Sequence, residues 1–211
     1  MRPELIAILA FAVLLPGVVV ALILVHRHQV GARTAAAERL GLAYVRGREG
    51  AARGAVLGAI RVRGSDRLVG AWRGRPARVD FARRSHGSHG GTDYTRASLE
   101  GGAPPGMSFV LERDSLRWRL GEALGLTKDL KTGDEAFDHG WRVKGNPEAA
   151  VLQVLRPPTL RAALAREPSP VAVLAREGRL ELLVRRTAME PERVRAILDL
   201  ASDLADAVSV P

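Results

Sequence analysis

Cysteine is absent from the chain, and its absence excludes a disulfide framework, thiolate metal sites and a cysteine nucleophile. It does not decide the compartment, because a cysteine-free chain suits either side of a membrane. Lysine occurs only at Lys128, Lys131 and Lys144, so arginine supplies nearly all of the positive charge. In a chain this rich in alanine and glycine, that bias indicates genomic base composition rather than a selected recognition surface.

Acidic residues are scarce in one part of the chain. Residues 26–84 hold fourteen Arg against four acidic residues, whereas residues 85–211 hold seventeen basic and eighteen acidic residues. The formal net charge of +9 therefore comes from the N-terminal part. This distribution favours a surface near anionic lipid headgroups, where each Lys or Arg is worth on the order of 1 kcal/mol. A solvated arginine-rich face is an equally simple interpretation, and nucleic-acid binding is a third.

One long apolar run stands out. Residues 5–25 contain no charged or hydrogen-bonding side chain. A helix rises about 1.5 Å per residue, so a run of this length crosses the roughly 30 Å of hydrocarbon in a bilayer. The run is too long for a signal peptide, and no small-x-small cleavage site separates it from the basic flank that begins at His26. The sequence therefore predicts one transmembrane helix.

Basic residues around this run predict its orientation. Arg2 alone lies on the short side, whereas Arg27, Arg33 and Arg39 follow on the long side. Because cytoplasmic flanks carry the excess of Lys and Arg, we expect a single-pass protein of the bacterial inner (plasma) membrane with a cytoplasmic C-terminal domain. The expected organisation is a short flank over 1–4, the span over 5–25, a juxtamembrane stalk over 26–45 and one soluble domain over 46–211.

The pattern after the run is typical of an α+β domain with an antiparallel sheet. Alternation of apolar and polar residues recurs in several short stretches bounded by glycine and proline. Helices are expected over 147–155, with Asn146 as N-cap, and over 159–166. The predicted strands lie over 68–72, 75–81, 92–99, 107–113, 137–145, 171–175 and 179–185.

The last element is the most regular one. Residues 191–208 place apolar side chains at helical spacing, and Asp199, Asp203 and Asp206 lie on the opposite face. We expect this amphipathic helix to cover the sheet, with docking of a partner helix as the alternative. The apolar stripe consists of Val194, Ile197, Leu198, Ala201, Leu204, Ala205 and Val208.

A histidine pair offers the best candidate for a metal site. His86 and His89 lie three residues apart, and Asp93 or Asp134 could add a carboxylate, so the alternative function is a metal-dependent hydrolase. The surrounding loop is rich in glycine and holds neither imidazole in place. We therefore favour a flexible hairpin connection and predict no metal, no cofactor and no catalytic residue.

Three acidic residues are crowded into a short segment at Asp134, Glu135 and Asp138. General acid and base catalysis needs two carboxylates of unlike pKa across a cleft, which adjacent loop residues do not provide. We predict instead a turn in which Asp134 bonds the local backbone and Phe137 anchors the following strand.

Three segments together carry a resemblance. They are LGLAY over 40–44, GRPARVDF over 74–81 and TGDEAFDHGWRVKG over 132–145. In this layout the chain resembles uncharacterised bacterial single-pass membrane-anchored proteins with a GD-x-x-FD-x-x-hydrophobic-x-V-x-G segment. The resemblance covers most of the tethered domain and implies an α+β domain behind a membrane anchor, with no assigned activity.

The leading hypothesis is a non-enzymatic, membrane-anchored binding or scaffolding protein with a basic membrane-proximal surface. We expect Arg46, Arg48 and Arg53 to contact anionic lipid headgroups or a protein partner. A nucleic-acid-binding domain is less favoured, because the three tryptophans are too scattered along the chain to form a platform on which bases stack.

Overall fold

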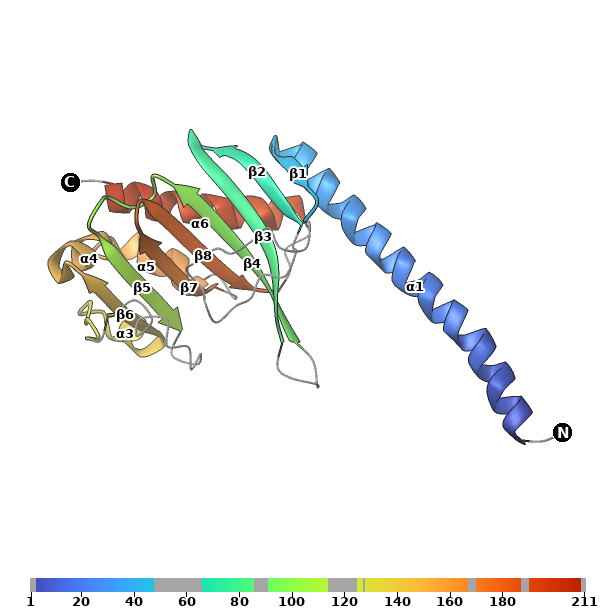
Figure 1. Ribbon diagram of the computed structural model, residues 1–211. Coiled ribbons are helices and arrows are strands. Elements are labelled where there is room, and N and C mark those ends of the chain that lie inside the picture. The colour runs from blue at the N-terminus through green and yellow to red at the C-terminus, as the bar shows by residue number, and fades with distance from the viewer. Residues whose placement is uncertain are drawn as a thin grey trace.

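The computed structural model describes residues 3–47, 66–85, 91–113, 125–126, 128–166, 170–186 and 190–209. In these residues a long N-terminal helix leads into an α+β domain built on one sheet (Figure 1). Among the described residues, eight strands form this sheet in the order β1-β2-β3-β4-β8-β7-β5-β6, and every neighbouring pair is antiparallel. The strands are β1 (Ala43–Val45), β2 (Arg67–Trp72), β3 (Arg75–Ser85), β4 (Gly91–Glu100), β5 (Ser108–Arg113), β6 (Trp141–Asn146), β7 (Pro170–Arg176) and β8 (Arg179–Arg185).

The predicted strands over 68–72 and 75–81, and those over 171–175 and 179–185, pair as two tight hairpins. Arg73 and Gly74 join β2 to β3, and Glu177 and Gly178 join β7 to β8, all four with positive φ. This backbone twist matches the twist of the paired strands. The β7–β8 hairpin lies between β4 and β5, so a late part of the chain closes the middle of the sheet.

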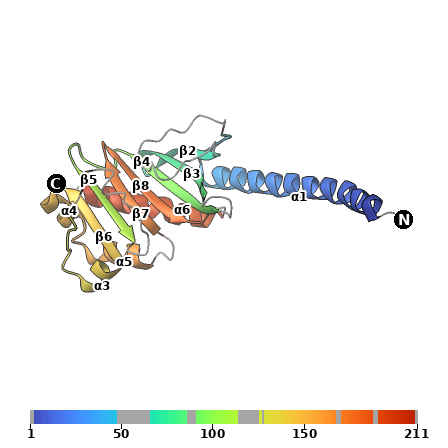
Figure 2. The same ribbon diagram turned by 60° about the horizontal axis from the view of Figure 1, so that its bottom comes forward.

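One face of the sheet packs against α6 (Pro191–Ser209), as both views of the ribbon show (Figures 1 and 2). The whole predicted apolar stripe of this helix is buried, which confirms that the helix covers the sheet. On its other side, Asp199 accepts a hydrogen bond from Trp72 Nε1 at 3.1 Å and ion-pairs with Arg73. Asp203 also pairs with Arg73, so the acidic face of α6 holds the β2–β3 hairpin.

Three short helices, α3 (Glu135–Gly140), α4 (Glu148–Val154) and α5 (Pro158–Arg166), lie at the β6 end of the domain. The strand predicted from residue 137 is wrong in its first half, because Asp134 caps α3 and the strand begins only at Trp141. Pro147 rather than Asn146 is the N-cap of α4, and it provides no side-chain hydrogen bond.

The long N-terminal helix α1 (Pro3–Leu40) projects from the β1 edge of the domain (Figure 1). Within the ranges given above, no helix combines the length with the apolar content that a bilayer crossing requires. The predicted transmembrane helix over 5–25 is therefore wrong. Three further predictions depend on that helix, and the structure does not support them. They are the single-pass topology, the inner-membrane location and the cytoplasmic orientation.

The end of α1 is fixed to the domain. Arg33 Nη1 lies 2.6 Å from Asp66 Oδ2, and the guanidinium carbon lies 4.6 Å from the centre of the Phe81 ring. Ala37 and Leu40, further along α1, are buried in the domain core. The projecting part of the helix therefore has a defined direction relative to the sheet.

Candidate functional site

Of the three arginines predicted to contact lipid, the structure describes one. Arg46 is exposed just after β1, and its Nη2 lies 3.4 Å from Nε2 of His26 in α1. Arg48 and Arg53 lie outside the described residues, so the predicted set of three stays a prediction.

The proposed metal ligands are not brought together in the described part of the chain. His86 and His89 lie outside it. Asp93 is exposed in β4, where its backbone carbonyl accepts a hydrogen bond from the Arg186 N–H at 2.7 Å. Across the residues that the structure describes, no three His, Cys, Asp or Glu side chains gather to hold a metal ion.

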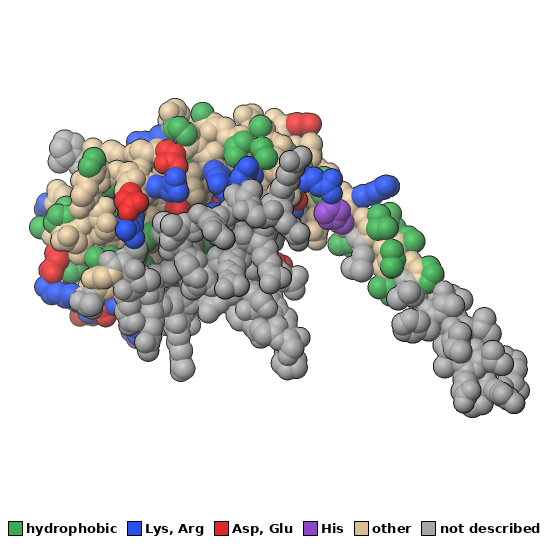
Figure 3. Space-filling model, in the orientation of Figure 1, with side chains coloured by type: hydrophobic (Ala, Val, Ile, Leu, Met, Phe, Trp, Pro, Cys, Tyr) green, Lys and Arg blue, Asp and Glu red, His purple; other side chains and the backbone are tan. Residues whose placement is uncertain are grey.

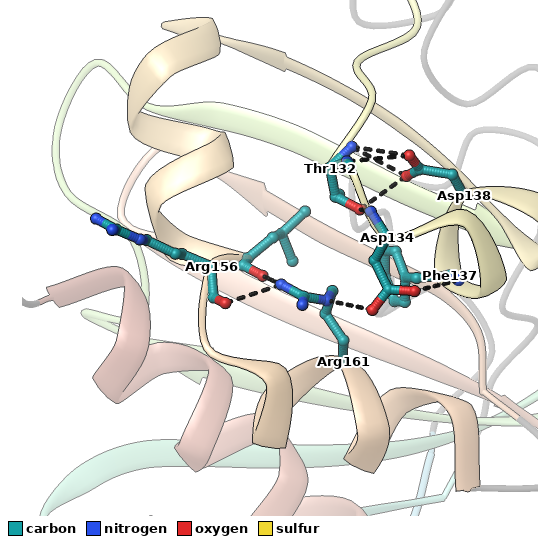
Figure 4. A network of polar contacts seen from close by, with 8 residues as sticks. Thr132, Asp134, Phe137, Asp138, Arg156 and Arg161 are labelled. Carbon is teal, nitrogen blue, oxygen red and sulfur yellow. Dashed lines mark hydrogen bonds and ion pairs between the residues drawn. The ribbon is translucent and has the colours of Figure 1, made fainter.

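The acidic segment around residue 134 forms a folded corner (Figure 4). The Asp138 carboxylate accepts hydrogen bonds from the backbone N–H and the hydroxyl of Thr132, at 3.0 and 2.8 Å. Asp134 accepts one from the Phe137 N–H at 3.1 Å and thereby begins α3. Phe137 is buried and stacks on Trp141 with 5.9 Å between ring centroids. These contacts confirm the predicted local turn and its aromatic anchor.

Arg161 of α5 connects this corner to the end of α4 (Figure 4). Its Nε donates to Asp134 at 2.9 Å, and its Nη1 donates to the carbonyls of Leu155 and Arg156 at 2.7 and 2.8 Å. The Phe137 N–H and the Arg161 guanidinium hold the pKa of Asp134 below its usual range. Because it accepts these bonds as an anion, Asp134 is suited to a structural role and not to that of a general acid.

A second polar cluster lies on the sheet face opposite α6. The register places Asp80 beside Arg96, and Ser98 between Arg78 and Glu181. In the orientation of Figure 1, with α6 behind the sheet, Figure 3 shows acidic and basic side chains next to one another. Opposite charges on neighbouring strands stabilise the pairing, and the described charges of this cluster, Arg78 and Arg96 against Asp80 and Glu181, balance one another.

Asp80 is the centre of this cluster. Its side chain is fully buried, and it accepts hydrogen bonds from Arg78 at 2.6 and 2.8 Å and from Arg96 at 2.8 Å. The Arg96 side chain is only 5% exposed. Since a buried charge is tolerated only when it is paired, removal of Asp80 would leave the Arg96 guanidinium uncompensated.

A hollow of about 270 Å³ opens over β2, β3, β4 and β8 beside this cluster. Arg179 and Glu100 at its edge form an ion pair of 2.6 Å. Its described lining has an apolar part from β2 and β3 and a polar part mostly from β4 and β8. The apolar part is Val69, Gly70, Pro76 and Ala77, and the polar part is Arg78, Arg96, Ser98, Glu100, Arg179 and Glu181.

Glu181 is the one carboxylate of this lining that is both buried and incompletely bonded. Its side chain is 5% exposed, and its Oε2 accepts no hydrogen bond from the part of the chain that the structure describes. Arg96 Nη1 lies 3.8 Å away, which is an ion pair but too long for a hydrogen bond. Burial raises the pKa of Glu181, and the nearby Arg96 and Arg179 offset this only in part.

The third feature is the apolar surface of α1. Among the described residues, the large exposed hydrophobic side chains all belong to this helix and are 47% to 59% exposed. Figure 3 shows them as green side chains beside blue and purple ones. A groove of about 510 Å³ along this surface is lined by Val19, Ile23, His26, Arg27, Val30 and Arg46. The exposed hydrophobic residues are Val18, Val19, Val20, Ile23, Leu24 and Val25.

Neither a protein-family model nor a curated protein matches the chain. Its fold is similar to the crystal structure of the mycobacterial trehalose monomycolate transport factor A, TtfA. The TM-score is 0.60 at 14% sequence identity, over 88% of this chain and 99% of that one. At this identity the likeness shows a common fold.

The buried charges on the sheet are the residues that sequence reasoning missed. Their signal is an alternation of charged residues within strands, as in Arg78 and Asp80, Arg96 and Glu100, or Arg179 and Glu181. Alternation alone predicts an exposed polar face, because it does not reveal what covers that face in the folded chain. The burial of Asp80, Arg96 and Glu181 could therefore not be read from the sequence.

Proposed function

We propose that the protein is a non-enzymatic binding or scaffolding protein that associates with a membrane surface through α1. The observation that carries this proposal is the apolar surface of α1 next to basic side chains. Large exposed hydrophobic residues that lie together mark interaction sites for proteins or membranes. Arg27 and Arg46 line the same groove, which suits a lipid surface that carries anionic headgroups.

The rigid attachment of α1 supports the scaffolding part of the proposal. The Arg33–Asp66 ion pair and the buried residues Ala37 and Leu40 fix the helix to the domain. A lipid surface that binds the projecting part would therefore also orient the sheet and its hollow. The printed name of the structure with a similar fold, a transport factor for trehalose monomycolate, is compatible with a binding role at a membrane.

Co-flotation of the full chain with lipid vesicles tests the proposal. Replacing Val19 and Ile23 by serine removes apolar contact, and we expect the partition onto vesicles to fall roughly tenfold or more. Replacing Arg27 and Arg46 by glutamine should weaken binding to anionic vesicles by about tenfold and leave binding to zwitterionic vesicles nearly unchanged.

The control variant replaces Ala35 and Glu38 by serine. Both residues are exposed on α1 outside the groove. This variant should float like the wild type. Equal partition of the Val19/Ile23 variant and the wild type would refute membrane association through this surface. An equal loss for the control pair would show that any change in α1 has the same effect, which also contradicts the proposal.

A further inference from the structure

One residue in the lining of the hollow has an incompletely bonded carboxylate. Glu181 lines the hollow, and its buried Oε2 accepts no hydrogen bond from the residues that the structure describes. A buried polar atom left unpaired costs roughly 1–3 kcal/mol and more when charged, so such atoms are exceptional and call for an explanation. A ligand that donates a hydrogen bond from within the hollow would complete the bonding of this carboxylate.

The charges around the hollow argue against an ionic ligand. Arg78 and Arg96 both bond the Asp80 carboxylate, and Arg179 bonds Glu100. An anion would compete with these carboxylates for guanidiniums that are already paired. A cation would meet three arginines. A neutral group that carries both donors and acceptors avoids both conflicts.

The shape and the apolar part of the lining restrict the ligand further. Binding sites for drug-sized ligands span roughly 300–1,000 Å³, so a hollow of about 270 Å³ accepts a small ligand. Val69 and Pro76 provide apolar contact on the side of β2 and β3, opposite the polar groups of β4 and β8. A sugar ring is likewise divided into an apolar and a polar part, with C–H groups on its faces and hydroxyls around its rim.

We infer that the hollow binds a neutral polyhydroxylated ligand of the size of one sugar ring, with the Glu181 carboxylate accepting a hydrogen bond from a ligand hydroxyl. Ser98 belongs to the same lining, and its hydroxyl is a group of the kind that can bond a further ligand hydroxyl. This inference does not rest on the proposed membrane association, because it concerns a different surface.

The test uses saturation-transfer NMR and calorimetry to measure binding to the full chain. The compounds are methyl glucoside, methyl galactoside, methyl mannoside and myo-inositol. We expect at least one of them to bind saturably. A hydrogen bond to a charged group is worth about 1.5–3 kcal/mol, so Glu181→Gln should weaken that binding by about tenfold or more. The variant should be at least as stable to heat as the wild type, because it removes a carboxylate that the fold leaves incompletely bonded.

Glu112→Gln is the matched control, since Glu112 is also a buried carboxylate and the strand register places it on the same face of the sheet, away from the hollow. It should bind the sugar like the wild type. Absence of saturable binding for all four compounds, or equal binding by the Glu181→Gln variant, would overturn the inference. Inorganic phosphate or ethanolamine that binds in their place and loses affinity on the same substitution would also overturn it.

Discussion

Two buried carboxylates on one face of the sheet, Asp80 and Glu181, have opposite surroundings. Asp80 accepts hydrogen bonds from two guanidiniums, whereas Glu181 has an oxygen without a donor. The first therefore holds the fold together, and the second is tolerated at a cost in stability. Residues that a fold tolerates at such a cost are common in binding sites.

The raised pKa of Glu181 gives this contrast a pH dependence. Between the ordinary glutamate value of 4.5 and the raised pKa, the unfolded chain loses the Glu181 proton while the folded chain keeps it. Stability contributed by this group is thus present at low pH and is lost as the pH rises through that range. We expect the free energy of unfolding of Glu181→Gln to increase relative to that of the wild type as the pH rises from about 4.5 through the raised pKa of Glu181.

Asp80→Asn should lower the free energy of unfolding at neutral pH by about 3–5 kcal/mol, because the buried Arg96 loses its partner. Urea unfolding of both variants at several pH values measures the two effects. If Glu181→Gln is less stable than the wild type at pH 7, the Glu181 carboxylate is a structural group and this interpretation is wrong.

At the level of elements, local patterns predicted most of the domain. The hairpin turns at Arg73-Gly74 and Glu177-Gly178 and the stripe of α6 depend on residues close in sequence, so periodicity reveals them. The strand predicted from residue 137 was ambiguous, because a short apolar run suits a strand or a helical turn equally well. In the structure the Asp134 side chain accepts a hydrogen bond from the Phe137 N–H and so stabilises a helical turn there.

The role of Asp134 as the cap of α3 can be tested by hydrogen exchange. Asp134→Ala removes both the cap and the partner of Arg161, so the amide of Phe137 should exchange with solvent at least several-fold faster than in the wild type. Asp134→Asn keeps a side chain that caps well, so its exchange should lie between the two. Hydrogen exchange followed by NMR measures this order. Equal exchange in the alanine variant and the wild type would contradict the role given to Asp134.

At the level of the whole molecule, the order of the strands depends on pairing between distant parts of the chain, which the sequence did not predict. The insertion of the β7–β8 hairpin between β4 and β5 joins strands far apart in the chain, and no local pattern encodes it. The helix α1 likewise joins the predicted run over 5–25 and most of the predicted stalk over 26–45 into one element from residue 3 to residue 40. The charge excess did suggest a basic region near the apolar residues, and Arg46 lies there, beside His26 of α1.

The central claim is that the apolar surface of α1 contacts lipid, and a single fluorescent label tests it most directly. Since the chain has no cysteine, Val19→Cys can carry an environment-sensitive dye on the full chain, with Lys128→Cys, near α4, as the control. On addition of anionic vesicles, we predict a blue shift at position 19 and quenching by a lipid-attached quencher, with neither change at position 128. An unchanged spectrum at position 19, or equal changes at both positions, would contradict the account.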